Sequence, residues 1–538
     1  MTDFCIDLSY NCIYFKLRVC YTIYSHRMIQ ALYIIINNGN VIDRQEEFQR
    51  NFVFERIGYH MKKFGKDSAA RMAALTLALL LTITSSACGG EVESPEVTTA
   101  DIVTTEAETT EAYPSYDFGG QDFNIFVRPE RLYYLDAESQ NGDVFDDAVF
   151  ERNSTVEALC NVNITYIDAP RDSMATMIQT SVMAGDGAYD LVMPDYMYID
   201  STSGIYLNLL ADVDIDFDKK WWCQGWNDNI TIDGKIYSCV GDYCLDLLRN
   251  THVVYFSKPL IDSFGLENPY ELVKSGKWTI DKMAEMGRIL SNDMNADGVF
   301  DANDSYGIYC NFQSKRGILQ AMGELLVTFD NNGSLVNNFE SQSFESRYNR
   351  LYKLLNEDES VYYADDNFAD FQNAEAFKIF NRKELMFIMA GLFAVDGMRT
   401  SDVDFGIVPV PKADETQESY QSYNHGCSPI AIPKTVKDPQ MSAAVLDLLM
   451  RVSSENVVPV YYNQVLKGKV SRDEESAEML DLIFSNLVFD FTFINDVSGL
   501  WADINSVSRE NLSSLIASNL TAFNEAMNRL MEKYAELD

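Results

Sequence analysis

Apolar and polar residues follow one another in a regular order along residues 121–193. Gln121–Val127 alternates like a strand, and Val162–Ile167 and Asp190–Met193 are further short apolar runs. Between them, Asp147–Leu159 and Met174–Ala184 place apolar residues three and four positions apart, which is the helical period. This β-α-β-α-β order predicts a parallel sheet with helices packed on its faces.

Long helices dominate the rest of the chain. Their periodicity predicts them at Ile280–Leu290, Phe344–Leu355, Met441–Val452, Ala477–Ser485 and Val507–Glu536. Thr279 is the expected N-cap of the first, and Asp281 in its first turn suits the helix dipole. Further strands are expected at Asp404–Val410 and Ser428–Ile432. The pattern therefore predicts an α/β protein of two lobes.

A short apolar run behind a basic flank lies within the first ninety residues. Basic residues between Lys62 and Arg71 precede the apolar run Met72–Ile83, and small residues then lead to Cys88. This order is typical of a secretory signal peptide, since twelve apolar residues are too few to span a bilayer. The Cys resembles that of the bacterial lipobox, which is lipidated and becomes the new N-terminus.

We therefore expect residues 61–87 to be a lipoprotein signal peptide and Cys88 to carry the lipid. Residues 1–60 are then upstream sequence from a start codon assigned too early, the alternative being a cytoplasmic extension. Residues 88–114 carry seven acidic residues, no basic ones and many Thr, too little apolar surface to fold. They predict a flexible tether between a lipid anchor and the folded body.

The length, net charge and histidine content of the chain argue against several classes of function. The chain has 538 residues with 42 Lys and Arg against 81 Asp and Glu, a net charge of −39. This length predicts two or three domains. So negative a chain does not bind nucleic acid or dock electrostatically on anionic lipid. Its four His residues are never three or four positions apart, which argues against a His-rich metal site.

Motifs of common enzymes are missing from the sequence: it has no G-x-S-x-G, P-loop, H-E-x-x-H or Rossmann glycine pattern. The absence of C-x-x-C leaves a redox role unsupported. Disulfides and free buried thiols both remain open for the six cysteines of the body, which are Cys160, Cys223, Cys239, Cys244, Cys310 and Cys427.

The run DMNADGVFDAND has the spacing of an EF-hand calcium loop. Its predicted ligands, at loop positions 1, 3, 5, 7, 9 and 12, are Asp293, Asn295, Asp297, Val299 (through its carbonyl), Asp301 and Asp304. Gly298 stands at position 6, where the loop must turn sharply, and Asp304 replaces the usual bidentate Glu. We expect one structural Ca²⁺; the alternative is an acidic solvated turn.

Aromatic residues gather near the expected strand ends. They are Tyr133, Tyr134, Tyr196, Tyr198, Trp221, Trp222, Trp226 and Trp501. Aromatic faces beside amide and acid groups suit a sugar, whose ring offers C–H faces for stacking and hydroxyls for hydrogen bonds. The alternative for each of them is packing in the core.

Several short stretches follow one another in a characteristic order along the body. They are Tyr189–Val192 with Leu207–Leu209, Lys219–Trp222, Gly234–Tyr237, Asn268–Tyr270 with Gly276–Thr279, and Asp404–Pro409 with Pro411–Lys412. In this order the chain, from about Tyr116 to Asp538, resembles the bacterial extracellular solute-binding proteins of family 1, the receptors of ABC sugar importers.

The resemblance implies an α/β fold of the two-lobed type II periplasmic-binding-protein kind, with a ligand cleft between the lobes. Lobe 1 would comprise residues 115–245 plus 387–455, and lobe 2 residues 246–386 plus 456–538. The crossings would lie near Tyr243–His252 and Phe387–Phe393. By position in the family pattern, the ligand-binding candidates are Arg128, Asp195, Tyr196, Trp222, Gly391, Leu392, Phe393 and Trp501.

The function implied is capture of an oligosaccharide and its delivery to the transmembrane subunits of an ABC permease, without covalent chemistry. We expect a monomer, held on the extracellular face of the cell membrane by its lipid anchor alone. Asp195 and the negative net charge favour neutral hydroxyl donors over anionic ligands. The alternatives are a secreted carbohydrate-active hydrolase stabilised by calcium, and a ligand-sensing lipoprotein of a two-component system.

Overall fold

The computed structural model describes residues 112–330, 333–363, 374–398, 401–463, 474–495 and 498–537. They lie within one compact unit, Thr109–Asp538. The upstream extension 1–60, the signal peptide 61–87, the lipidation site Cys88 and the tether up to residue 111 lie outside the described residues. Among the described residues, no helix is long and apolar enough to cross a membrane.

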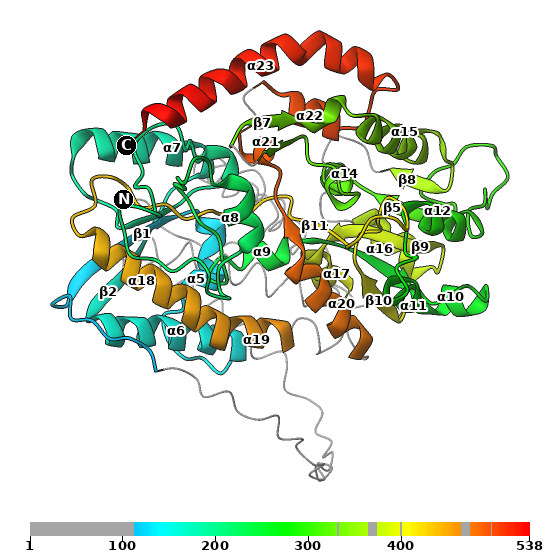
Figure 1. The fold of residues 1–538 in the computed structure, drawn as a ribbon. Helices are drawn as coiled ribbons and strands as arrows, with labels where there is room; N and C mark the ends of the chain where they lie inside the picture. The colour runs from blue at the N-terminus through cyan, green and yellow to red at the C-terminus, as the bar shows by residue number, and fades with distance from the viewer. Residues whose placement is uncertain are drawn as a thin grey trace, which may run out of the picture. The chain divides into compact units, whose positions relative to one another are not determined.

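The first lobe is built on a parallel sheet of order β2-β1-β3. Its strands are β1 (Gln121–Val127), β2 (Val162–Asp168) and β3 (Leu191–Met193). Helices α6 (Val144–Cys160) and α18 (Pro439–Val452) lie on one side of these strands, and α7 (Met174–Ala184) lies on the other (Figure 1). Single antiparallel bridges, Val192 to Ala431 and Cys239 to Ile430, extend the sheet beyond β3. The predicted strand Ser428–Ile432 is therefore an extended segment with isolated bridges.

The second lobe is built on a mixed sheet of order β10-β4-β9-β5-β8. Its strands are β4 (His252–Ser257), β5 (Tyr306–Cys310), β8 (Val361–Tyr363), β9 (Leu385–Gly391) and β10 (Phe405–Val408). The helices of this lobe are α10 (Lys258–Ser263), α11 (Pro269–Lys274), α12 (Ile280–Arg288), α13 (Phe312–Lys315), α14 (Ile318–Ala321), α15 (Gln342–Glu357), α16 (Ala374–Asn381), α17 (Val395–Met398) and α20 (Glu474–Ser485).

Two small sheets and further helical elements complete the fold. Two small sheets pair β6 (Val327–Phe329) with β7 (Leu335–Asn337) and β11 (Ser422–Tyr423) with β12 (Leu487–Val488). The remaining helical elements are η1 (Pro129–Arg131), α5 (Leu132–Leu135), η2 (Arg171–Ser173), η3 (Tyr196–Tyr198), α8 (Gln224–Ile230), α9 (Asp246–Arg249), η4 (Asn338–Glu340), η5 (Leu392–Ala394), η6 (Ser453–Val457), α19 (Val458–Tyr461), α21 (Phe491–Ile494), α22 (Leu500–Asn505) and α23 (Leu512–Glu536).

Two described segments that cross between the sheets run side by side. The first leads from α9 into β4, within the predicted crossing Tyr243–His252. The second, residues 424–431, is named here the return segment: its Asn424 bridges Thr251 and its Ala431 bridges Val192. The predicted return at Phe387–Phe393 is wrong, because β9 pairs with β4 and β5 in the second sheet. Residues 387–423 therefore do not belong to the first lobe.

The C-terminal helix α23 contacts both lobes. Phe523 packs edge-on against Phe339, with ring centroids 5.2 Å apart, and Asn337 Nδ2 donates to Asn524 Oδ1 at 3.0 Å. At its other end, Lys235 Nζ from the first lobe donates to the carbonyl oxygens of Tyr534, at 3.1 Å, and Leu537. Figure 1 shows α23 running from the side of α15 and α22 toward α7. This helix thus connects the two lobes away from the crossing segments.

The helical periodicity predicted most of the long helices close to where the structure has them. The predictions for β1 and α7 are confirmed at both ends, and Thr279 caps α12 by accepting the N–H of Lys282 at 3.2 Å. The last helix begins later than predicted, at Leu512 behind its N-cap Asn511. Val507 has a φ of +46°, which is incompatible with a right-handed helix, and this is why the helix cannot start there.

The six cysteines and Tyr113 all belong to the packed body. All six cysteines of the body are free and buried, so the option of disulfides among them is not realised. The tether was predicted to reach residue 114, but Tyr113 packs on the body. Its hydroxyl donates to Glu455 Oε2 at 2.5 Å, and the guanidinium of Arg451 lies 4.7 Å from its ring centroid. The ordered body therefore includes Tyr113.

The contact of α12 with β5 depends on two glycines. A Cβ on Gly307 would lie 2.3 Å from the Cα of Gly287, closer than nonbonded carbons come. We expect Gly307→Ala to lower the free energy of unfolding by about 1–3 kcal/mol, because the helix must shift away from the strand. Thermal unfolding checks this, with Ser263→Ala on the exposed face of α10 as the control. An unchanged melting temperature in both would contradict the close packing.

Candidate functional site

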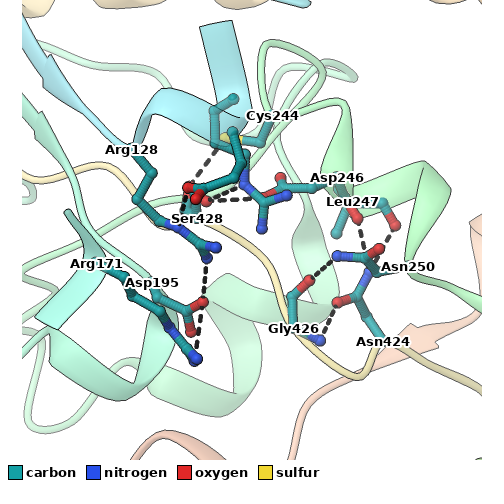
Figure 2. Close-up of polar contacts among 12 residues, drawn as sticks. Arg128, Arg171, Asp195, Cys244, Asp246, Leu247, Asn250, Asn424, Gly426 and Ser428 are labelled. Carbon is teal, nitrogen blue, oxygen red and sulfur yellow. Dashed lines mark hydrogen bonds and ion pairs between the residues drawn. The ribbon is translucent and has the colours of Figure 1, made fainter. Parts of the chain in front are cut away.

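Three charged side chains meet at the carboxyl edge of the first sheet. Arg128 follows β1, Arg171 follows β2 and Asp195 follows β3. Because parallel strands end at the same edge of a sheet, these positions are neighbours in space, and ligands of open α/β sheets bind at this edge. Figure 2 shows both guanidinium groups directed at the Asp195 carboxylate.

Asp195 Oδ2 accepts from both arginines. It lies 2.5 Å from Arg128 Nη1 and 3.2 Å from Arg171 Nη2. The side chains of Asp195 and Arg128 are 7 % and 13 % exposed, whereas that of Arg171 is 40 % exposed. Asp195 Oδ1 also accepts the backbone N–H of Met197, which fixes the start of η3. This carboxylate is therefore occupied within the protein, and the group that faces solvent is the Arg171 guanidinium.

A second ion pair lies beside the first crossing. Arg131 Nε is 3.0 Å from Asp246 Oδ2, and Ser428 Oγ from the return segment donates to the same oxygen at 2.7 Å. Burial opposes the charge of Arg131, but the Asp246 carboxylate raises its pKa above the ordinary value. The pair thus joins η1, α9 and the return segment into one fixed layer.

Amide side chains hold the two crossing segments together (Figure 2). Asn424 Nδ2 donates to the carbonyl oxygens of Asp246 and Leu247 at 3.2 and 2.7 Å, and Asn424 Oδ1 accepts the N–H of Gly426 at 2.8 Å. Asn250 Nδ2 donates to Gly426 O at 2.5 Å. These bonds satisfy the backbone groups that the bend between the lobes leaves without sheet partners.

Two histidines lie at the same crossing. His252 Nε2 is 2.9 Å from His425 Nδ1, which is also 3.0 Å from Asn250 O. The His252 ring stacks on Tyr423, with centroids 4.5 Å apart. Burial lowers the pKa of His425 to about 4, and burial together with the neighbouring imidazole lowers that of His252 well below its ordinary value. Both rings are therefore neutral at pH 7.

Aromatic rings from two distant parts of the chain meet beside Asp195. Tyr196 stacks on Phe493 with centroids 4.1 Å apart, and Phe493 packs edge-on against Trp501 at 5.0 Å. The N–H of Tyr196 donates to Cys427 O at 3.1 Å, which ties η3 to the return segment. Tyr196 and Trp501, both predicted from the sequence, are thus brought together through Phe493.

The second lobe adds to the candidate site the residues that follow the carboxyl ends of β5 and β9. α13 follows β5, and Ser314 in it donates to Met389 O at 2.6 Å, near the end of β9. Gln313 in α13 is 7 % exposed, and its Oε1 has no hydrogen-bond partner among the described residues. Beyond β9, the ring of Phe393 packs edge-on against His425 at 5.8 Å.

The other predicted site residues have different positions. Gly391 pairs with His252 in the sheet, and Leu392 is fully buried, so both shape the crossing through their backbones. Tyr255 Oη donates to their carbonyl oxygens at 3.3 and 3.1 Å. Trp222 is 3 % exposed and packs against Phe217, with centroids 4.9 Å apart. The structure places it in the core of the first lobe and does not join it to the other candidates.

The sequence predictions did not include two residues of the candidate site. Arg171 follows the carboxyl end of β2, and the rule that ligands of open α/β sheets bind at this edge would have found it. Phe493 lies about 300 residues from Tyr196 in the sequence, and no local pattern marks it. Only the folded chain shows that it completes the aromatic group.

The predicted calcium loop has the turns that its sequence requires. Gly298 has a φ of +80°, and Asp293 accepts the N–H groups of Ala296 and Gly298 at 2.7 and 2.8 Å. Asp304, fully buried, accepts from Met294 and Asp301 at 2.9 and 2.8 Å. Among the described residues, no three His, Cys, Asp or Glu side chains are grouped so as to hold a metal ion. Calcium binding therefore stays a prediction.

Comparison with known proteins identifies relatives of this fold. A family model described as bacterial extracellular solute-binding protein matches residues 137–450, more than half of the chain. Among curated proteins none matches. M. tuberculosis UspC is similar in structure, with a TM-score of 0.50 and 15 % identity over 75 % of this chain and 100 % of its own.

Two structures from Listeria monocytogenes are also similar. The ABC substrate-binding protein Lmo0181, solved with cycloalternan, has a TM-score of 0.48 and 15 % identity over 76 % of this chain and 99 % of its own. The maltose-binding protein MalE, solved with maltose, has a TM-score of 0.48 and 15 % identity over 75 % of this chain and 98 % of its own. The predicted two-lobed type II fold is confirmed.

The two histidines make stability depend on pH. Because the folded-state pKa of His425 lies below the unfolded value of about 6.5, the unfolded chain binds more protons as the pH falls between them. The stabilisation from His425 is complete above the unfolded-state pKa of about 6.5 and is lost as the pH falls toward 4. We expect His425 alone to remove roughly 2 kcal/mol from the free energy of unfolding between pH 7 and pH 5. Denaturant titrations at both pH values measure it.

The control for this measurement must account for Asp242. Burial raises its pKa to about 6, so its protonation stabilises the folded state as the pH falls through that value, opposite in sign to the histidines. The quantity to compare is therefore the loss on acidification in the wild type and in His425→Gln. A smaller loss in the variant is expected, and an equal loss would show that His425 is not held neutral.

Proposed function

Because the chain belongs to the bacterial extracellular solute-binding protein family, we propose that it captures an oligosaccharide outside the cell and delivers it to an ABC import permease. The proteins of this family bind solutes, and the alternative of a hydrolase would need carboxyl groups free to act on the substrate. At the site described here Asp195 and Asp246 are both ion-paired with guanidinium groups. The site thus provides hydrogen-bond donors beside packed aromatic rings, of which Phe493 and Trp501 are each 6 % exposed.

The observation that carries the proposal is the meeting of aromatic and polar groups at the sheet edges. Tyr196, Phe493 and Trp501 come from separate elements and lie next to the Arg128–Asp195–Arg171 group. Sugar rings combine C–H faces, which pack on aromatic rings, with hydroxyls, which accept from guanidinium N–H groups. A solute with both kinds of surface fits this set better than a wholly apolar or wholly ionic one.

Ligand capture would depend on rotation of the lobes about the crossing segments. The hydrogen bonds of Asn250 and Asn424 hold these segments as one unit, so closure requires changes of φ and ψ at only a few positions beside them. A ligand that contacts residues of both lobes shifts the equilibrium toward the closed state by its preference for that state.

Attachment to the membrane is the second part of the proposal. The signal sequence of residues 61–87 and Cys88 support a lipoprotein anchored on the extracellular face, with residues 89–111 leading from the lipid to the body that begins by Tyr113. A tether of this kind would keep the protein beside the permease while the lobes remain in the extracellular solution.

Oligosaccharide binding is tested with residues 112–538, the part of the compact unit that the structure describes, produced without the signal peptide. We expect at least one oligosaccharide in a broad panel to raise the melting temperature, since a ligand that binds only the folded state stabilises it by mass action. Phe493→Ala should weaken binding about tenfold, because it removes the central ring of the aromatic group. Thermal unfolding measures the rise in melting temperature, and isothermal titration measures the loss of affinity.

The matched control is Phe489→Ala, which also removes a buried ring, one that packs on Trp226 and not on Tyr196 or Trp501. The sugar recovered after binding should be intact by mass spectrometry. Cleavage of the sugar would replace the binding function by a hydrolase, and failure of every oligosaccharide to bind would refute the proposed ligand class.

Calcium is proposed as a structural ligand of residues 293–304. We expect CaCl₂ to raise the melting temperature by a few degrees over EDTA, because the ion would bind the folded loop and not the unfolded chain. Asp293→Asn should abolish the difference, while Asp262→Asn, an exposed acid of α10, should retain it. Equal melting temperatures of the wild type with calcium and with EDTA would show that the loop is an acidic turn.

A further inference from the structure

A cavity of about 540 Å³ adjoins the site between the first lobe and the C-terminal helix. Its lining includes Met197 and Tyr198 in η3, Asn495 after α21, and Arg529 and Lys533 in α23. We name it the α23 cavity. It is distinct in composition from the aromatic group, because two of its side chains are exposed cations.

Arg171 connects this cavity to the site at the sheet edge. Its Nη2 lies 3.3 Å from Met197 Sδ, and its guanidinium lies 5.4 Å from the ring centroid of Tyr198. Both partners line the α23 cavity. Arg171 Nε is buried and has no hydrogen-bond partner among the described residues. The guanidinium therefore retains unused donors beside the cavity.

The carboxylates around the cavity have hydrogen-bond or ion-pair partners, including Asp200, which is the one acid in the lining. Asp195 is shared with Arg128, Asp172 accepts the hydroxyl of Tyr198 at 2.8 Å, and Asp200 accepts from Thr202 at 2.9 and 2.7 Å. Glu525 lies 3.7 Å from Arg529, with both side chains more than 60 % exposed, so this pair is weak. Lys533 forms no ion pair with any described residue.

The net charge of the whole chain does not cancel this local arrangement. Solvent ions screen interactions beyond about 8 Å at physiological salt, so a ligand in the cavity responds mainly to the groups around it. In a chain with almost twice as many acids as bases, two cations nonetheless line one cavity, and a third, Arg171, contacts its lining residues. The expectation from composition, that neutral ligands are preferred, does not take this local placement into account.

We infer that the solute is an acidic oligosaccharide, whose carboxylate or sulfate group binds in the α23 cavity between Arg171 and the Arg529 and Lys533 side chains. The inference rests on the proposed function and names its ligand class. Guanidinium forks match the oxygens of both anions. Because α23 also packs on the second lobe, an anion held by both sides would connect the lobes in the closed state.

The test compares sugars that differ only in charge. Oligosaccharides of galacturonate, glucuronate and mannuronate are titrated calorimetrically against residues 112–538. Each is compared with its carboxyl-reduced neutral form. A separate titration uses sulfated galactose oligosaccharides. We expect at least one acidic sugar to bind about tenfold more tightly than its neutral counterpart, and this preference to fall as NaCl is raised. The arm that binds distinguishes carboxylate from sulfate.

Variants then locate the charge preference. Lys533→Gln should reduce the acidic-to-neutral affinity ratio about tenfold and leave the neutral affinity unchanged. Arg171→Gln, which also removes donors from the sugar site, should reduce this ratio and weaken neutral binding as well. Arg288→Gln is the matched control, because it removes the same charge at an exposed position in the second lobe. Equal or tighter binding of the neutral sugars, or an unchanged ratio in both site variants, overturns the acidic ligand and leaves the proposed function standing. Binding of no sugar at all overturns both.

Discussion

The pairing of two crossing segments fixes the position of everything else in this molecule. Thr251 bridges Asn424, and the Asn424 amide donates to the carbonyl groups of the first two residues of α9. Because the carboxyl ends of β3, β5 and β9 lie near this crossing, residues that follow those strands come together although they are far apart in the sequence. The site is thus a product of where the chain crosses, and its side chains are positioned by buried amide hydrogen bonds.

Buried carboxylates determine how the scarce cations of the chain are distributed. A carboxylate away from water needs a charged or strongly hydrogen-bonding partner. Asp195 receives Arg128 and Arg171, and Asp246 receives Arg131 with Ser428. The excess guanidinium at Asp195 then points toward the α23 cavity. In this way a structural need of the fold, the neutralisation of a buried acid, also supplies the donors that a ligand would meet.

Local sequence patterns predicted the elements better than their assembly. The limits of β1 and α7 follow from periodicity, and the N-cap Thr279 from its side-chain chemistry, since both depend on neighbouring residues. The assignment of β9 to a crossing came from the family resemblance and failed because β9 pairs with β4 and β5, while the chain returns through residues 424–431. Phe493 and the α23 cavity could not be foreseen, since they arise from contacts over hundreds of residues. Trp222 is the opposite case: it was predicted as a ligand-binding residue, and the structure buries it in the core of the first lobe.

The contacts of the first lobe also set an order in which the chain can fold. Its sheet needs Ala431 beside Val192, and Lys235 binds the carbonyl of Tyr534, which is 299 positions later. Contacts of such separation form slowly, because long stretches of chain must be ordered before they are gained. Until the return segment arrives, the outer edge of β3 has no strand partner, and unpaired edges recruit other chains. The first lobe, although it begins the body, is therefore incomplete until residues near Tyr534 are in place.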